Sequence, residues 1–274
     1  MQDILVHANN YETWTHSLHY AADMATLLDA SLTGIFVSEP VLPLPTMGMP
    51  LLFPEIYMIA AEVVKSAQQA EPAFRKSASA LGVKRNRWLV AEGHLSPVLA
   101  YAANWHDLLV LESGIKAPWS SIGALGAVVL ACGAPCLVVP DSYTRRASVD
   151  TIAVAWNGSV ESIRAVHAAL PFLKRAKRIV LIHGERMQPY SLIDWKPPLN
   201  IENHLKHHGL EFSKRAITVA DDAVGTELLS VAWEVRADML VMGAYGRARF
   251  SEWVFGGATR HVLEHGKLPI FMRH

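Results

Sequence analysis

The chain alternates short apolar runs, typical of buried strands, with longer stretches in which apolar residues recur at helical spacing. In the first half the expected strands are 3–8, 32–37, 87–91, 105–111 and 136–139, and in the second half they are 151–156, 178–183, 216–220, 239–242 and 270–272. The expected helices are 18–28, 59–81 and 97–104, followed by 163–173, 201–208, 225–235 and 260–265. Regular alternation of this kind predicts parallel sheets with right-handed crossovers.

The second half of the chain repeats the plan of the first. The run from Trp105 to Leu111 matches the run from Arg236 to Met242, with Asp107 and Asp238 in equivalent places, and each half closes with a glycine, a proline and a last strand. We therefore expect an α/β protein of two tandem doubly wound domains, each with five parallel strands and four helices. The expected domains are residues 1–141 and 150–274, joined by a polar linker.

A cluster of glycines follows the apolar run 239–242 and leads into the helical stretch 260–265. Gly243 and Gly246 come at once, and Gly256 and Gly257 precede Ala258 and Thr259. Glycines let the backbone approach a ligand closely, and the free N–H groups of a helix N-terminus bind phosphate. Arg247 and Arg249 add positive charge between them. A single G-x-x-G pair is common in loops, but the complete G-x2-G-x9-G spacing is specific.

That spacing resembles the nucleotide loop of the universal stress protein family, and the repeat resembles the family's tandem form. The resemblance implies strand order 3-2-1-4-5 in each half, with the last strands near the contact between the halves. It implies ATP or a related adenine nucleotide, with or without Mg²⁺. The residues it implies for ribose and phosphates are Gly243, Gly246, Arg247, Gly256, Gly257, Ala258 and Thr259, and those for the nucleoside are Ala155, Asn157 and Gly184.

The sequence departs from the family pattern at two of these positions. The family usually has Ser or Thr directly after the third glycine, where this chain has Gly257, and ATP-binding members usually have Asp where this chain has Asn157. Asn157-Gly158-Ser159 also reads as a turn that caps the next helix. In the first half, the stretch from Glu112 to Pro118 stands where the second half has Gly243 to Gly246. A carboxylate at Glu112 disfavours an anion there, and Pro118 removes a backbone N–H donor. We therefore expect the N-terminal half to have lost nucleotide binding.

Composition narrows the function classes further. Hydrophobic residues make up 51%, and 25 basic against 25 acidic residues give no net charge, which argues against a nucleic-acid or anionic-membrane binder. The start of the chain lacks the basic region of a signal peptide, and two cysteines make no disulfide framework, so a cytoplasmic protein is expected. We interpret Cys132 and Cys136 as buried thiols around Gly133-Ala134-Pro135.

Two further stretches could carry chemistry, an apolar stretch in the first half and a group of histidines in the second. The apolar stretch 41–61 is long enough for a membrane span, but five prolines from Pro40 to Pro54 exclude one helix, so we read Pro40 to Pro54 as a loop. That loop is either a lid or an apolar ligand site. His204, His207 and His208 share a helix face, a spacing that could bind zinc. The H-E-x-x-H pattern is absent and no cysteine is near in the sequence, so we favour a solvated histidine surface. The motifs G-x-S-x-G, G-x-x-x-x-G-K-[ST] and G-x-G-x-x-G are absent.

These observations predict a stress-response protein that binds an adenine nucleotide in its C-terminal half and acts as a sensor or regulator of an unidentified protein partner. The expected assembly is an intramolecular pseudo-dimer, with a homodimer left open. Two alternatives remain: a weak Mg²⁺-dependent ATPase, and a module around Pro40 to Pro54 that binds an apolar ligand or another protein.

Overall fold

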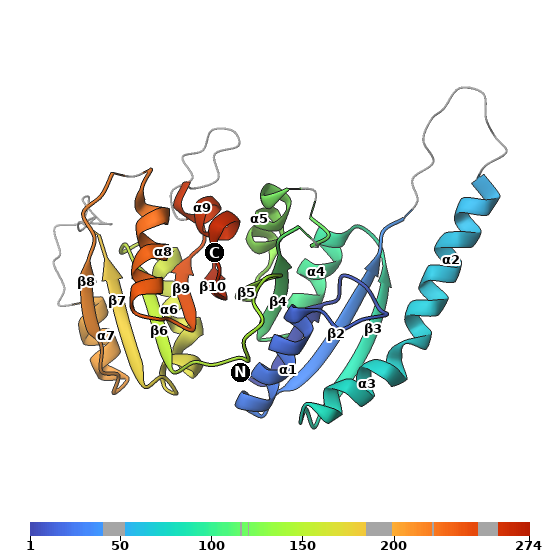
Figure 1. Cartoon of the computed structure of the whole chain (residues 1–274), viewed down its shortest axis with the longest axis horizontal. Coiled ribbons are helices and arrows are strands. Elements are labelled where there is room, and N and C mark those ends of the chain that lie inside the picture. The colour runs from blue at the N-terminus through green and yellow to red at the C-terminus, as the bar shows by residue number, and fades with distance from the viewer. Residues whose placement is uncertain (41–52, 116, 120, 185–198, 221, 246–256) are drawn as a thin grey trace.

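The computed structural model describes residues 1–40, 53–115, 117–119, 121–184, 199–220, 222–245 and 257–274 (Figure 1). The first half contains β1 (Asp3–His7), α1 (His16–Leu28), β2 (Ser31–Ser38), α2 (Phe53–Gln69), α3 (Glu71–Ala80), β3 (Asn86–Glu92), α4 (Leu95–Ala103), β4 (Leu108–Ser113), α5 (Ile122–Ala131) and β5 (Cys136–Pro140). The second contains β6 (Thr151–Trp156), α6 (Val160–Leu173), β7 (Arg178–His183), α7 (Ile201–His207), β8 (Ser213–Ala216), α8 (Val224–Glu234), β9 (Met239–Gly243), α9 (Gly257–His265) and β10 (Ile270–Arg273).

The strands form one ten-stranded sheet in the order β3-β2-β1-β4-β5-β10-β9-β6-β7-β8. Within each half the order is 3-2-1-4-5 and every pairing is parallel, as expected. The halves meet where β5 and β10 pair antiparallel, so the last strands make the contact (Figure 1). We call this β5–β10 pairing the seam.

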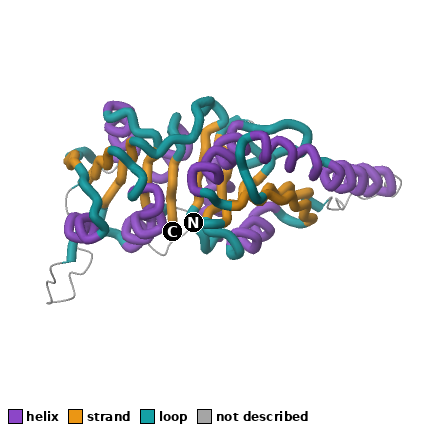
Figure 2. Tube along the Cα trace, turned by 90° about the horizontal axis from the view of Figure 1, so that it is seen from below, coloured by secondary structure: helices purple, strands orange, loops and turns teal. Residues whose placement is uncertain are grey.

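Helices cover both faces of the sheet, and each face has its own buried core (Figures 1 and 2). The core under α1, α3, α6 and α7 takes alternate strand residues such as Ile4 and Val6, whereas Leu5 between them enters the core under α4, α5, α8 and α9. This alternation follows from the two-residue period of a strand. Both cores run across the seam, so the two halves share their hydrophobic interior. Among helices made of described residues, none is both long and apolar enough to cross a membrane.

Two element predictions were wrong. The expected single helix over 59–81 is two helices, α2 and α3, which break at Ala70. Pro72 sits in the first turn of α3, where its missing N–H is harmless, but inside a longer helix its ring would clash with a carbonyl one turn earlier. The N-terminal half therefore has five helices among its described residues, one more than expected.

The expected strand 216–220 is also misplaced, because β8 spans Ser213–Ala216. Every residue of β8 is exposed, so the strand has no apolar alternation by which a sequence pattern could find it. It is placed by its pairing with β7, in which Val180 is in register with Ser213 and His183 with Ala216. Ile217, the second residue of the expected strand, is buried just after β8.

Two equivalent aspartates fix the start of the first strand in each half. The Asp107 carboxylate accepts the backbone N–H groups of Gln2 and Asp3 at 2.5 and 3.3 Å, and the Asp238 carboxylate accepts the N–H of Thr151 at 2.9 Å. Asp238 also holds the linker, because it accepts hydrogen bonds from Ser148 Oγ at 3.0 Å and Arg145 Nη2 at 3.3 Å. The repeat thus includes a shared side-chain role, because Asp107 and Asp238 each hold the start of the first strand of their half.

We expect Asp238→Ala to lower the free energy of unfolding by about 2 kcal/mol. Asp238 is 5% exposed, so its loss leaves the Thr151 N–H without an acceptor. The exposed Arg145 returns to water and contributes little. Urea denaturation followed by circular dichroism measures the change. Asp238→Asn keeps one oxygen acceptor and is the control, with a loss of about half that size. Equal losses in the two variants would show that the hydrogen bonds to Asp238 are not what stabilises the start of β6.

Candidate functional site

The candidate site lies at the carboxyl ends of β6 and β9. These strands are neighbours, with Ala153 opposite Leu240 and Val154 opposite Val241. The chain leaves β6 toward α6 on one face of the sheet and leaves β9 toward α9 on the other (Figure 1). Neighbouring parallel strands whose connections depart to opposite faces leave a crevice between them, which is the usual ligand position in doubly wound sheets.

Gly243 ends β9 in close contact with the first turn of α6. A Cβ atom on Gly243 would lie 2.6 Å from the Ser162 nitrogen and 2.7 Å from the Glu161 carbonyl carbon. Both neighbours are backbone atoms, so the side of the crevice nearest α6 requires glycine at this position. The glycine that the sequence marked for ligand approach therefore also serves the packing of β9 on α6.

The hydroxyl of Thr259 connects the end of β9 to the first turn of α9. Thr259 Oγ1 accepts the backbone N–H of Tyr245 at 3.3 Å, and both residues are buried. Tyr245 has the left-handed backbone conformation, with φ 58°, and burial raises the pKa of its phenol to about 12. Thr259, predicted to hold phosphates, thus has a structural role that holds the helix N-terminus at the carboxyl edge of the sheet.

Gly257 and Ala258 form the start of α9 at this edge. Gly257 is exposed, and no atom of the described residues lies within 4 Å of the position that its Cβ would take. The N–H groups of a helix's first turn have no acceptor within the helix, so they are available to an anion. Gly246, Arg247 and Gly256, the other predicted phosphate residues, lie outside the described residues.

On the opposite side of the crevice, Asn157 follows β6 and shapes the turn into α6. Its Oδ1 accepts the N–H of Ser159 at 3.0 Å, and Ser159 Oγ in turn accepts the N–H of Ser162 at 3.2 Å as the N-cap of α6. The turn-and-cap interpretation of Asn157-Gly158-Ser159 is therefore confirmed. The Asn157 Nδ2 group donates to no described residue, and the side chain is exposed.

Ala155 and Gly184 lie at the ends of adjacent strands. Ala155 in β6 is in register with Ile182 in β7, and Gly184 directly follows β7. Both residues are half-buried, and no described atom lies within 4 Å of the position that a Cβ on Gly184 would take. The structure thus gathers Ala155, Asn157, Gly184 and Gly243 along one edge of three neighbouring strands, and Gly257, Ala258 and Thr259 meet that edge through the contact to Tyr245. Sequence reasoning missed Tyr245, whose left-handed conformation leaves no pattern in a single sequence.

The equivalent crevice of the N-terminal half holds protein side chains. The Glu112 carboxylate is 2% exposed and accepts hydrogen bonds from Asn9 Nδ2 at 2.7 Å and from Ser17 Oγ at 2.9 Å. Trp119 donates its indole N–H to the Glu112 carbonyl at 2.6 Å and lies beside the His7 ring. Burial lowers the pKa of His7 to about 4, so this ring is neutral at physiological pH.

The Glu112 carboxylate therefore has a structural role, and its expected repulsion of a phosphate stays a prediction. The carboxylate is not directed at an incoming phosphate but turned inward, where its hydrogen bonds tie β4 to α1. Beyond it, a Cβ on Gly114 would overlap the Asp141 carboxyl group, which crowds the end of the strand further. The loss of nucleotide binding in this half stays a prediction, with side-chain filling of the crevice as its physical basis.

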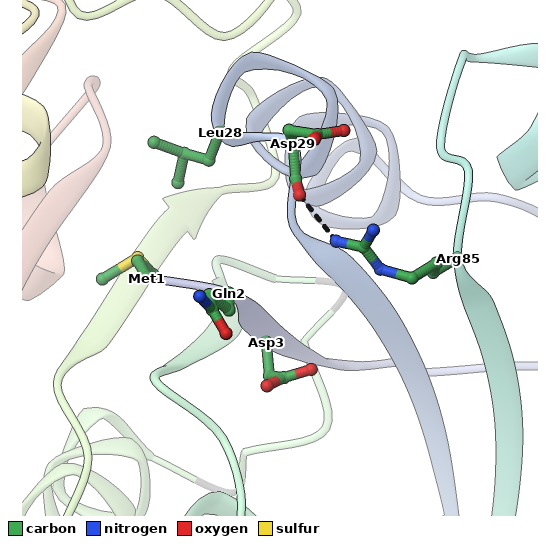
Figure 3. Close-up of a pocket in the computed structure, with 6 residues that line it drawn as sticks. All are labelled: Met1, Gln2, Asp3, Leu28, Asp29 and Arg85. Carbon is green, nitrogen blue, oxygen red and sulfur yellow. Dashed lines mark hydrogen bonds between the residues drawn. The ribbon is translucent and has the colours of Figure 1, made fainter.

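Two surface cavities lie elsewhere. One, of about 580 Å³, is lined by Met1, Gln2, Asp3, Leu28, Asp29 and Arg85 (Figure 3). It lies at the amino ends of β1, β2 and β3, whereas the candidate site lies at the carboxyl ends of the strands. Arg85 there donates to the Asp29 carbonyl at 2.8 Å. A second, of about 410 Å³, lies beside α2 at the carboxyl ends of β2 and β3, between Tyr57 and Glu92. The predicted apolar module borders this cavity at Pro40, but residues 41–52 lie outside the described residues.

The histidines of α7 form a row of rings. His204 lies 4.6 Å from His167 of α6 and 4.7 Å from His208, measured between ring centroids, and His207 lies 5.6 Å from His208. Desolvation lowers the pKa of His204, and the neighbouring histidines lower it further. Among the described residues, no group of three His, Cys, Asp or Glu side chains is arranged to hold a metal ion.

The sequence model of the Universal stress protein family matches residues 148–273. This C-terminal half of the chain belongs to the universal stress protein family. No curated protein sequence matches the chain. The match explains why strand order, glycine loop and crevice occur together in the C-terminal half. The N-terminal half lies outside the matched residues, and its membership of the same family stays a prediction.

Solved structures share the fold of the whole chain. A universal stress protein from Archaeoglobus fulgidus DSM 4304 is 16% identical with a TM-score of 0.64, and the alignment covers 98% of this chain and 94% of that chain. A functionally unknown protein from Pseudomonas aeruginosa PAO1 is 13% identical with a TM-score of 0.59, covering 99% and 92%. At such identities the likeness concerns the fold alone, and it extends over both halves.

Proposed function

We propose that this protein binds ATP or a related adenine nucleotide in its C-terminal half and acts as a nucleotide-dependent sensor or regulator of a stress response. The hydrogen bond from the Tyr245 N–H to Thr259 Oγ1 is the observation that carries this proposal. It holds the N-terminus of α9, whose first N–H groups have no acceptor within the helix, at the switch point between β6 and β9. An anion there would meet both the helix dipole and a glycine edge.

In the proposed complex, different residues contact the phosphates, the nucleoside and the base. The first turn of α9, from Gly257 to Thr259, receives the phosphates through its backbone. Gly243 keeps the crevice open beside α6, since only hydrogen fits there. Asn157 offers its free amide group to the nucleoside, and the open space at Gly184 receives the base. Gly246, Arg247 and Gly256 complete the phosphate loop in the proposed complex.

Titration calorimetry with Mg-ATP on the nucleotide-free full chain tests the proposal. Binding of one nucleotide per chain, competed by other adenine nucleotides but not by inorganic phosphate, supports it. A folded chain that takes up no adenine nucleotide rejects it. The weak ATPase alternative stays a prediction, which phosphate release measured on the same samples tests directly.

Variants at Gly257 locate the binding to α9. We expect Gly257→Asp to weaken Mg-ATP binding about tenfold, because the new carboxylate lies where the phosphates bind. The fold tolerates this change, since the position is open and an acidic residue suits a helix N-terminus. We expect Gly257→Ser to strengthen binding about fivefold by adding a hydroxyl donor. Gly257→Ala, which adds a Cβ alone, is the matched control. Equal affinities in the Asp and Ala variants would place the nucleotide elsewhere.

A further inference from the structure

A short helix, α7, lies at the outer edge of the C-terminal half, where its Glu202 pairs with Lys214 of β8 at 2.6 Å (Figure 1). The helix has seven residues, of which only Ile201 and Leu205 are buried. Leu210, just beyond the helix, is buried as well. Elements with few buried apolar side chains are the first to open in a folded protein. The docking of α7 on the rest of the fold therefore depends on a small number of contacts.

Four imidazole rings lie together where α7 faces α6. His204 is in the middle, with its ring centroid 4.6 Å from that of His167 in α6 and 4.7 Å from that of His208 at the end of α7. The His207 ring centroid is 5.6 Å from that of His208. We call these four rings the histidine row. At such short separations a positive charge on one ring repels a positive charge on the next.

The ring of His204 is placed for the neutral form. It is half-buried, and its Nε2 atom is buried without a hydrogen-bond partner among the described residues. A neutral imidazole carries one proton, whereas an imidazolium carries a proton on each nitrogen and needs an acceptor for both. Protonation of His204 in the docked helix therefore leaves a buried charge and an N–H group without an acceptor, which is costly.

The charges around the histidine row are positive. The described groups whose charges act on the His204 ring are the three other histidines, and Lys174, the C-cap of α6, acts on His208. Desolvation lowers the pKa of His208, and the charge of Lys174 lowers it further. The pKa of His204 is lowered by desolvation and then by repulsion from His167.

The carboxylates of the two helices are occupied or distant in the sequence. Glu202, the one carboxylate of α7, is paired with Lys214, and Glu161, the one carboxylate of α6, lies in the first turn of that helix. The other charged side chains of α6, α7, β8 and the turn before β8 are all exposed: Arg164, Lys206, Glu211 and Arg215. Arg215 is paired with Glu234.

We propose that the histidine row is a pH-sensitive contact, which holds α7 on α6 while the rings are neutral and releases the helix when they take up protons. The distances between the rings, the unpartnered Nε2 of His204 and the positive surroundings support this assignment. Release uncovers Ile201 and Leu205, which otherwise fill the core on this face of the sheet. The proposal concerns the outer edge of the C-terminal half and does not depend on nucleotide binding.

Release is favoured at low pH. In the docked helix, burial and the neighbouring rings lower the pKa of His204, whereas in a released helix the rings are solvated and the pKa returns toward its ordinary value of about 6.5. The docked state therefore binds protons more weakly than the released state. Its stabilisation is complete above about pH 6.5 and is lost as the pH falls below that value.

Hydrogen exchange at single amides of the full chain, measured by NMR at pH values of about 7.5 and 5.5 and corrected for intrinsic rates, tests the proposal. We expect the opening constant of the α7 amides to rise about tenfold between the two conditions. At both pH values it should exceed the opening constant of the β6 amides. Opening at β6 reports unfolding of the whole fold, to which the buried His7 also contributes at low pH because its pKa is lowered to about 4.

Single variants assign the effect to the rings. His204→Leu keeps an apolar side chain against α6 but takes up no proton, and its α7 opening constant should change less than about twofold over the same pH range. His167→Asn removes one neighbouring ring, and the response should fall to about threefold. His16→Asn, which removes an exposed histidine of α1, is the matched control and should keep the tenfold response of the wild type. Circular dichroism at neutral pH shows whether each variant is folded.

Titration of the imidazole C–H resonances gives a second readout. We expect His204 to titrate below the ordinary pKa of about 6.5 and its pKa to rise in His167→Asn, because one source of repulsion is gone. A His204 ring that titrates at or above the ordinary value would overturn the proposal. So would α7 amides that open no more at low pH, or that open only together with β6. A tenfold response that survives in both His204→Leu and His167→Asn would assign the pH dependence to other groups and reject the histidine row as its source.

Discussion

Phe271→Ala is expected to lower the free energy of unfolding by about 4 kcal/mol. Phe271 lies in β10, between Leu137 of β5 on one side and Val241 of β9 on the other, and is fully buried. Its ring packs edge-on against Phe172 of α6, with the ring centroids 5.4 Å apart. Alanine leaves a cavity in the core that both halves share and removes the edge-to-face contact, which adds about 1 kcal/mol to the loss of buried area.

Equilibrium unfolding in urea, followed by circular dichroism, gives the change in free energy. Phe271→Leu keeps most of the volume and is expected to cost about 1.5 kcal/mol. Trp233→Ala removes a larger side chain that is 80% exposed, and is expected to change the free energy of unfolding by less than about 0.5 kcal/mol. If Phe271→Ala costs no more than Trp233→Ala, the seam is not packed as described.

Gly243→Ala is expected to lower the free energy of unfolding by about 3 kcal/mol and to abolish detectable Mg-ATP binding. The added Cβ would lie 2.6 Å from the Ser162 nitrogen, closer than such contacts occur. Backbone atoms at the N-terminus of α6 cannot turn away as a flexible side chain can, so the end of β9 has to move. That movement displaces Ala244 and Tyr245, through which the N-terminus of α9 is held.

Gly184→Ala is the matched control for Gly243→Ala. It also adds one methyl group at a strand end of the same half, but no atom of the described residues lies within 4 Å of the new carbon. We expect its free energy of unfolding to stay within about 0.5 kcal/mol of the wild type. The loss of stability in Gly243→Ala tests the packing, and the loss of binding tests the proposed function. A stable Gly243→Ala chain would contradict the close approach whatever its affinity for nucleotide.

Much of the fold could be predicted from the sequence because local signals agree with it. Buried strands such as Thr151–Trp156 and Arg178–His183 are short apolar runs. The repeat, with Asp107 and Asp238 in equivalent places, allowed each element of one half to support the prediction of its counterpart in the other. The strand order and the position of the last strands came from the family resemblance, and both are confirmed. The prediction of two buried thiols is confirmed as well.

The features that the sequence did not predict depend on contacts between distant residues. The direction of the Glu112 carboxylate is set by Asn9 and Ser17, about a hundred positions earlier in the chain, and no local pattern encodes it. The placement of β8 depends on its register with β7, since its own residues carry no apolar signal. In the candidate site, sequence spacing located Gly243, but the reason for it is the approach of α6, which only the packed structure reveals.

The antiparallel pairing at the seam has a consequence for aggregation. Two separate five-stranded sheets would offer four open edges, each with unpaired backbone groups that can capture a strand from another molecule. Joining β5 to β10 leaves only β3 and β8 at the margins. β8 is a short strand that carries Lys214 and Arg215, and positive charge on a short edge strand opposes strand addition. A half of this chain expressed alone would uncover one apolar edge, Cys136–Pro140 or Ile270–Arg273, and is expected to associate through it.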